Sequence, residues 1–244
     1  MHAVVVGGGI SGAALTAAVR ARGWTVTQQS RSSGFDVLRD DARAAVDGAD
    51  VVVEATGRFT TSRRRATAFF TGSTRAVAAA TAATGARHVL LSILGCTLPA
   101  VQGYGYFAGK TAQEQEAAAA SGARLTVVRS TQWFEFARQN TERIRVGPVA
   151  LVPAMTIAPV ALDAVAAVVA DVVAGVRGGP VVEVAGPETT TLWAMTRALP
   201  GLPVRPVRMP LPGPTGRAFR DGALLPAAGT EVVGPRFADW LASR

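Results

Sequence analysis

The stretch HAVVVGGGISGAALTAAVRAR, His2 to Arg22, decides the fold. Its apolar run at residues 2–6 predicts a strand, and its alanine-rich part at residues 12–22 predicts a helix. The glycines of GGGISG between them permit a tight turn and bring backbone N–H groups close to a pyrophosphate. The partial positive charge of the helix N-terminus favours that anion. The context predicts dinucleotide binding, although a glycine-rich turn can also serve helix–sheet packing alone. The expected contacts in the loop are Gly7, Gly9, Ile10, Ser11 and Gly12.

Valine-rich apolar runs alternate with alanine-rich segments of helical length along the first half of the chain. This alternation is typical of a parallel sheet that helices cover on both faces. The expected strands are residues 2–6, 24–30, 35–38, 50–55, 87–93 and 124–129. The expected helices are residues 12–22, a short one within 41–47, 71–84 and 105–121. Six strands with right-handed crossovers predict an α/β fold with a doubly wound parallel sheet, the NAD(P)-binding Rossmann fold.

The pattern changes after residue 129, where glycine and proline interrupt it. A helix at 161–174, a strand at 181–185, a helix at 190–199, a proline-rich stretch at 200–214 and a helix at 237–242 are expected. These elements are too few for an independent domain. We therefore expect a dinucleotide-binding core of residues 1–132 and a small substrate-binding lobe of residues 133–244 that completes the same domain. The lobe should lie over the carboxyl edge of the sheet, where ligands bind in such folds.

The composition excludes several classes of protein. With 244 residues, 49% of them hydrophobic and 17% charged, the chain can bury a sizeable core and is not disordered. The apolar stretch at 161–176 is interrupted by Asp163 and Asp171, so no membrane span is expected. One cysteine, Cys96, excludes an internal disulfide, and no leader is visible at residues 2–6. Both observations favour a cytoplasmic protein.

The formal net charge of +8 raises nucleic acid as a partner. Apart from Arg63, Arg64 and Arg65, however, the arginines are scattered and form no basic helix face. We therefore expect solvated surface charge, with no nucleic-acid partner and no metal. The partner should be a small-molecule substrate, and the oligomeric state is left open.

The end of the second strand bears on the identity of the cofactor. An acidic residue there would hold the 2′-hydroxyl of NAD or FAD, but the sequence is Gln28-Gln29-Ser30-Arg31. Arg31 could pair with a 2′-phosphate, which favours NADP(H) over NAD(H), or it could be an ordinary exposed loop residue.

The end of the fourth strand should meet the same ligand. Thr56 and Gly57 are small enough to let a dinucleotide lie close. Glu54, just before them, either pairs with Arg58 or faces water.

The heptamer YGYFAGK, Tyr104 to Lys110, holds both tyrosines and the single lysine of the chain. At the start of a helix, the i,i+4 spacing places Tyr106 and Lys110 on one face. A cation beside a phenol favours the phenolate, so we expect the pKa of Tyr106 to move down toward the working range of a proton donor. The alternative is an exposed lysine at an ordinary helix start.

With these motifs in place, the chain resembles the atypical short-chain dehydrogenase/reductase family, and within it the NmrA-like NAD(P)H-binding proteins. The segments that carry the resemblance are VVVGGGISG (4–12), HVLLSILG (88–95), GYFAGKTAQEQ (105–115) and VVRSTQWFEF (127–136), with VEVAGPE (182–188) and RFADWL (236–241). Two departures stand out. The glycine loop is one residue shorter than the usual GxxGxxG, and Ala108-Gly109 precedes the lysine where relatives carry a large or basic residue, which predicts a looser pocket floor.

The resemblance implies roles for single residues. Tyr106 would be the proton donor, and Lys110 would bind the nicotinamide ribose and lower the pKa of the tyrosine. Ser92 would orient a substrate oxygen, unless it is a strand-end hydroxyl bonded to backbone. Gln132, Trp133 and Phe134 would face the substrate, unless the two aromatic rings serve lobe packing.

The function that the resemblance implies is an NADPH-dependent reduction of a carbonyl, enone or quinone-like group on a small apolar molecule. The alternatives are a non-catalytic NAD(P)-sensing regulator of the NmrA type, or a non-redox isomerase, dehydratase or cyclase of secondary metabolism. A flavoenzyme is disfavoured, because 244 residues leave little room for a separate substrate domain.

Overall fold

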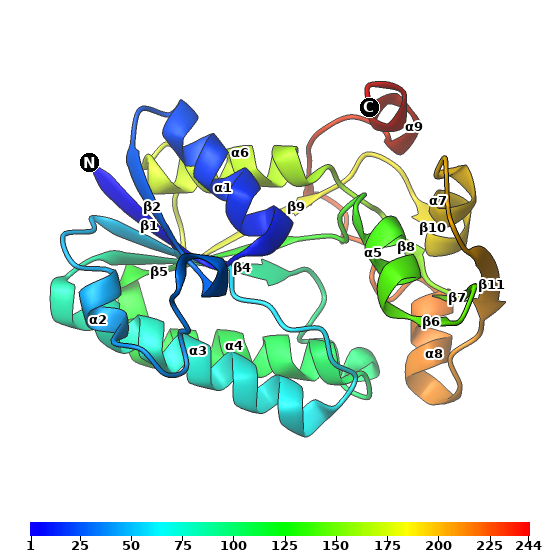
Figure 1. Ribbon diagram of the computed structural model, residues 1–244, viewed down its shortest axis with the longest axis horizontal. Helices are drawn as coiled ribbons and strands as arrows, with labels where there is room; N and C mark the ends of the chain where they lie inside the picture. Colours follow the sequence, from blue (N-terminus) through cyan, green and yellow to red (C-terminus); the bar gives the residue numbers. More distant parts are fainter.

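The computed structural model describes residues 1–244, and a seven-stranded parallel sheet forms its centre (Figure 1). The strand order is β12-β9-β5-β4-β3-β1-β2, and every neighbouring pair is parallel. The strands are β1 (His2–Val6), β2 (Thr25–Gln29), β3 (Val51–Glu54), β4 (Arg87–Ile93), β5 (Leu125–Ser130), β9 (Val181–Ala185) and β12 (Glu231–Val232). The chain order reverses next to β1, so the switch point of a doubly wound fold lies directly at the glycine loop.

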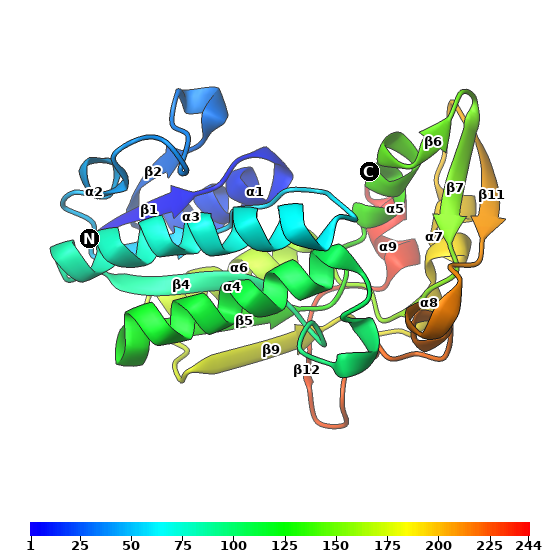
Figure 2. The ribbon, with the colours of Figure 1, turned by 90° about the horizontal axis from the view of Figure 1, so that it is seen from below.

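Helices cover both faces of this sheet, as Figures 1 and 2 show. One face carries α1 (Gly9–Ala21) and α6 (Leu162–Val173), and the other carries α2 (Ala42–Ala45), α3 (Arg63–Thr84) and α4 (Gly105–Ser121). None of the helices combines the length and the apolarity that crossing a membrane requires. Successive residues of β1 join opposite cores, with Ala3 and Val5 packed toward α1 and α6 and Val4 and Val6 toward the other layer. A strand buried on both faces needs apolar residues throughout, which explains the continuous valine runs.

A smaller lobe lies beyond the carboxyl ends of the strands (Figure 2). It consists of a three-stranded sheet in the order β11-β7-β6, a short antiparallel pair β8-β10, and several short helices. The strands are β6 (Arg145–Val146), β7 (Val149–Pro153), β8 (Thr156–Ile157), β10 (Thr190–Thr191) and β11 (Arg205–Met209), and the helices are α5 (Phe136–Arg143), α7 (Leu192–Ala198), α8 (Gly213–Arg220) and α9 (Phe237–Ala242). An apolar cluster that includes Phe134, Phe219 and Phe237 forms the core of the lobe.

The doubly wound parallel sheet is confirmed, but two of its details differ from the sequence prediction. The strand predicted at residues 35–38 is wrong, because Phe35 inserts into the core beside α2 while Asp36 Oδ1 accepts the Leu38 N–H at 3.0 Å and turns the chain. The strand at 181–185 belongs to the main sheet, and β12 extends that sheet further. The chain after residue 132 therefore builds both the lobe and one edge of the central sheet.

The pocket floor is tighter than the sequence suggested. Helices α3 and α4 pack side by side on one face of the sheet and lie in front of it in Figure 2. A Cβ at Gly109 would lie 2.7 Å from Phe70 Cδ2 and 2.8 Å from Ala66 Cβ. Real Cβ atoms do not approach so closely, so Gly109 is what lets the two helices meet at this point. The expectation of a loosened floor is wrong, since the glycine serves interhelical packing.

Candidate active site

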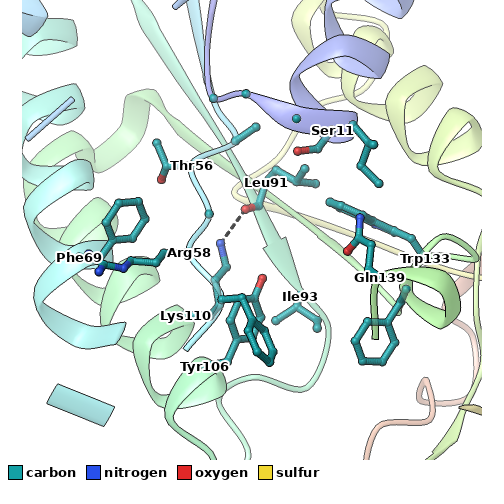
Figure 3. A pocket seen from close by; sticks show the side chains of 18 of the residues that line it. Ser11, Thr56, Arg58, Phe69, Leu91, Ile93, Tyr106, Lys110, Trp133 and Gln139 are labelled. Carbon is teal, nitrogen blue, oxygen red and sulfur yellow. Dashed lines mark hydrogen bonds between the residues drawn. The ribbon is translucent and has the colours of Figure 1, made fainter. Parts of the chain in front are cut away.

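A cavity of about 890 Å³ runs from the carboxyl ends of the central strands into the lobe (Figure 3). One end is formed by the glycine loop and by residues 29–32 and 35–38. The middle holds Tyr106, Lys110 and Ser92, and the lobe closes the other end. Aromatic and aliphatic side chains dominate that far end: Tyr104, Phe107, Phe136, Met155, Leu211 and Phe219. The cavity has room for an elongated ligand along one wall and for a small apolar molecule at the lobe end.

The glycine loop has the backbone geometry of an anion cradle. Gly7 (φ 151°) and Gly9 (φ 67°) occupy conformations that favour glycine, and a Cβ at Gly7 would collide with the Ala55 carbonyl. Gly7, Gly9, Ile10 and Ser11 line the cavity, and α1 begins at Gly9 with its first N–H groups free of intrahelical partners. Gly12 lies outside the lining. Its missing side chain lets α1 approach the Gly7 carbonyl, and its contact with the cofactor stays a prediction.

The residues predicted to meet the ribose line the same end of the cavity. Arg31 begins a short 3₁₀ turn (Arg31–Ser33) and is exposed, and its guanidinium forms no hydrogen bond or ion pair with the protein. Thr56 and Gly57 line the wall opposite. Asp36, which the sequence analysis missed, also lines this end. It lies beyond β2, in the irregular segment for which the sequence predicted a third strand.

Tyr106 and Lys110 lie at one wall of the cavity, as predicted, on the first two turns of α4 (Figure 3). The ring of Tyr106 packs edge-on against Phe70, with centroids 5.6 Å apart. Burial raises the pKa of Tyr106 to about 12, although the positive charge of Arg143 opposes the rise. The predicted downward shift of this pKa is wrong for the protein alone, because desolvation of the phenolate outweighs the nearby cations.

Lys110 is a buried member of the wall, not an exposed lysine. Only 3% of the residue is exposed, and its Nζ donates to the Leu91 carbonyl at 2.9 Å and to Gln113 Oε1. Burial lowers the pKa of Lys110, and the negative charge of Glu54 works against this effect. An ammonium group has three N–H donors, so one stays available to a ligand hydroxyl after these two bonds.

A buried network anchors the lysine from below. Gln113 links Lys110 to Glu54, since its Oε1 accepts from Lys110 and its Nε2 donates to Glu54 Oε1 at 2.7 Å. Glu54 is fully buried, accepts the Thr74 hydroxyl at 2.7 Å, and lies 3.1 Å from His88 Nε2. Burial tends to raise the pKa of Glu54, but the bonds to His88 and to neighbouring hydroxyls lower it overall. Neither expectation for Glu54, pairing with Arg58 or facing water, is correct.

Ser92 lies at the end of β4 and lines the cavity. Its hydroxyl is 3.9 Å from Cys96 Sγ and bonds to no backbone group, so the strand-end alternative is not realised. Cys96 Sγ in turn donates to Glu114 Oε1 at 3.3 Å, and Arg129 holds that carboxylate at 2.6 Å. Burial raises the pKa of Cys96 to about 12, which keeps the thiol protonated.

Gln132, Trp133 and Phe134 follow β5 and Thr131, and they do not all face the cavity. Gln132 and Trp133 line the cavity, and the indole Nε1 donates to Ser130 Oγ at 3.0 Å. Phe134 is fully buried, with its ring centroid 5.2 Å from that of Phe237. The prediction that Phe134 faces the substrate is therefore wrong, and the lobe-packing alternative holds for it.

No protein-family model matches the sequence, and no curated protein matches it as a relative. Solved structures do share the fold. The dTDP-4-dehydrorhamnose reductase from Bacillus anthracis in complex with NADP aligns with a TM-score of 0.71 at 12% identity over 99% of this chain and 97% of that chain. A short-chain dehydrogenase/reductase superfamily protein from Agrobacterium tumefaciens with bound NAD aligns at 0.66 and 18% identity over 100% and 96%. The dTDP-glucose 4,6-dehydratase from Streptomyces venezuelae with bound NAD aligns at 0.67 and 18% identity over 100% and 95%.

The protein thus has the doubly wound Rossmann fold, which it shares with solved structures that hold NADP or NAD. The solved structures of similar shape include a short-chain dehydrogenase/reductase superfamily protein, so the predicted resemblance is confirmed for the fold. The NmrA-like assignment stays a prediction.

Proposed function

We propose that the protein is an NADPH-dependent reductase of a carbonyl, enone or quinone-like group on a small apolar molecule. The observation that carries the proposal is the position of Tyr106 and Lys110, midway between the glycine cradle and the apolar end of one continuous cavity. A dinucleotide laid along the wall from the cradle would bring its nicotinamide end to these two side chains. Solved structures of the same shape that hold NADP or NAD support this direction.

The residues present fit such a cofactor. The first N–H groups of α1 would hold the pyrophosphate, and the unpartnered guanidinium of Arg31 would pair with a 2′-phosphate. Lys110 would donate its third N–H to a ribose hydroxyl. Bound NADPH would supply the hydride. Tyr106 would give its phenolic proton to the substrate oxygen, and the charges of Lys110 and Arg143 would stabilise the phenolate left behind.

Cofactor preference gives the first test. Replacing Arg31 by Ala should weaken NADPH binding about 10- to 100-fold, because hydrogen bonds to a charged group contribute about 1.5–3 kcal/mol. NADH binding should stay within a factor of about 2, since NADH carries no 2′-phosphate for the arginine to hold. Fluorescence titration of both dinucleotides measures the effect. Arg43→Ala is the matched control, because Arg43 is also exposed but lies on α2 outside the cavity lining.

Equal affinity of the parent protein for NADPH and NADH would contradict the assigned role of Arg31. Asp36 would then be the residue to test, as its carboxylate lines the same end of the cavity and could hold ribose hydroxyls.

The pKa of Tyr106 predicts the pH dependence. A phenol with a pKa of about 12 stays protonated below that pH and loses its proton only as the pH rises through it. The kcat/KM for carbonyl reduction should therefore show no alkaline decline due to Tyr106 between pH 6 and about pH 10. The reverse oxidation needs the phenolate and should accelerate with pH over the same range. A decline of the reduction rate near pH 7–8 that depends on Tyr106 would contradict this prediction.

A second candidate is a reaction without net redox change, such as a dehydration or isomerisation in which the dinucleotide is recycled. The dTDP-glucose 4,6-dehydratase, which holds NAD and shares the fold, favours it. Substrate conversion without net change in NADPH absorbance would support this candidate. The non-catalytic NAD(P)-sensing alternative is motivated by the shortened glycine loop, and NADPH oxidation with any member of a carbonyl panel would contradict it.

A further inference from the structure

The side chain of Gln132 is buried on the cavity wall with no partner in the protein. Only 6% of the residue is exposed, and neither Oε1 nor Nε2 makes a hydrogen bond. Gln113, a second buried glutamine, shows the usual state: its Oε1 accepts from Lys110, and its Nε2 donates to Glu54. Buried amides are nearly always bonded, because leaving a desolvated donor or acceptor unpaired is unfavourable.

The backbone around Gln132 is held in place. Its carbonyl accepts the Val160 N–H at 2.9 Å, and the preceding Thr131 N–H donates to Val184 at 3.1 Å. On the other side, the indole of Trp133 is tied to Ser130 Oγ at 3.0 Å. The Gln132 side chain therefore extends from a fixed backbone segment at the carboxyl end of β5. A fixed backbone at this point lowers the entropic cost of presenting the Gln132 amide to a ligand.

A second residue of the cavity wall also carries an unpaired buried atom. Oδ1 of Asn140 makes no hydrogen bond, as Oε1 and Nε2 of Gln132 make none. Asn140 is itself held by a bond from Nδ2 to the Leu151 carbonyl at 3.0 Å. The rest of the lobe end combines apolar side chains with Gln139, Glu142 and Arg143. Packing alone would be served better by leucine or methionine at position 132 than by a desolvated amide.

We propose that Gln132 is a specificity-determining residue that pairs through Oε1 and Nε2 together with a ligand group presenting a hydrogen-bond donor beside an acceptor. A carboxamide, a lactam or a protonated carboxylic acid presents such a donor beside an acceptor. The inference rests on the proposed function, because that function supplies two sources of such a group: the carboxamide of the nicotinamide ring, or an amide-like group on the substrate. A ligand without an adjacent donor and acceptor leaves the Gln132 amide unpaired and is rejected.

Gln132→Leu tests the proposal, with Gln139→Leu as the matched control. Gln139 lines the same cavity, but it is only half-buried and makes no hydrogen bond that the change would break. Each variant is titrated with NADPH and with 2′-phospho-ADP-ribose, which lacks the nicotinamide. Each is then assayed with the aldehyde pair 4-formylbenzamide and 4-methylbenzaldehyde, of which only the first carries a carboxamide.

If the cofactor is the source, Gln132→Leu weakens NADPH about 10- to 100-fold and leaves 2′-phospho-ADP-ribose unchanged. If the substrate is the source, both nucleotides bind as before, and a preference of the parent for 4-formylbenzamide of at least about 10-fold in kcat/KM disappears. Gln139→Leu should reproduce neither pattern, because it removes no unpaired buried amide. The proposal is overturned if Gln132→Leu matches the parent in all four measurements, or if it weakens both nucleotides alike.

Thermal unfolding of the ligand-free variants separates recognition from a structural role. Gln132→Leu should melt at or above the temperature of the parent, because the change removes an unpaired buried amide. A melting temperature well below that of Gln139→Leu would show that the amide supports the fold and would overturn the proposal. If the parent binds neither nucleotide, the proposed function fails. Binding of benzamide against toluene, by the parent and by Gln132→Leu, then decides on Gln132 alone.

Discussion

Replacing Tyr106 by Phe should lower the rate of carbonyl reduction about 10²- to 10⁴-fold, the range that a positioned general acid contributes. The change removes one hydroxyl and keeps the ring that packs edge-on against Phe70, so the fold and the NADPH affinity should be retained. Steady-state kinetics with NADPH and a turned-over carbonyl compound, together with dinucleotide titration, measure both parts of the prediction.

Tyr104→Phe is the matched control for that experiment. Tyr104 is the other tyrosine, lines the same cavity, and packs edge-on against Phe107 and Phe219. Its loss of a hydroxyl should leave kcat within a factor of a few. Equal turnover by Tyr106→Phe and the parent would remove Tyr106 from the mechanism, and a comparable loss in Tyr104→Phe would point to disturbed packing instead.

Replacing Glu54 by Leu should have the largest effect on stability, a loss of about 3–5 kcal/mol in the free energy of unfolding. The carboxylate is fully buried and accepts bonds from Thr56 at 2.9 Å, Thr74 at 2.7 Å and Gln113 at 2.7 Å. Leucine would leave these donors and His88 without their partner. For a chain of this length the loss corresponds to a fall in melting temperature on the order of 10 °C.

Glu54→Gln is the control that keeps the shape and most of the bonds. The amide oxygen can accept from the hydroxyls, and its NH₂ can donate to His88 Nε2 when the imidazole proton lies on Nδ1 beside Ser121 Oγ, 2.9 Å away. A milder loss is expected. Urea unfolding of the three proteins measures the series, and equal stability of Glu54→Leu and the parent would show that the network adds nothing.

The buried network around Glu54 also positions Lys110. Gln113 joins Glu54 on β3 to Lys110 on α4, so the ammonium group is held by the sheet as well as by its own helix. Weakening the network should therefore disturb the position of Lys110 as well as the fold. Lower stability reduces the apparent dinucleotide affinity only by the fraction of Glu54→Gln that is unfolded. A larger fall in affinity would show that the network positions Lys110.

The sequence alone determined those features that depend on neighbours along the chain. The strand–loop–helix at residues 2–22 follows from an apolar run, glycines and alanines in succession, and β1 and β4 lie at the predicted residues. Tyr106 and Lys110 share a cavity wall because the spacing on a helix dictates it. The glycine loop was likewise predictable, because its glycines directly follow the first strand in the sequence.

Only the tertiary structure decided what packing controls. Glu54 meets His88, 34 residues away, and Phe134 turns into the lobe core while its neighbours Gln132 and Trp133 line the cavity. The pKa of Tyr106 rises although a lysine lies one turn away, because desolvation depends on every group that encloses the phenol. Periodicity in a sequence reports which face of an element is buried, but partners and desolvation are set by segments that approach from elsewhere in the chain.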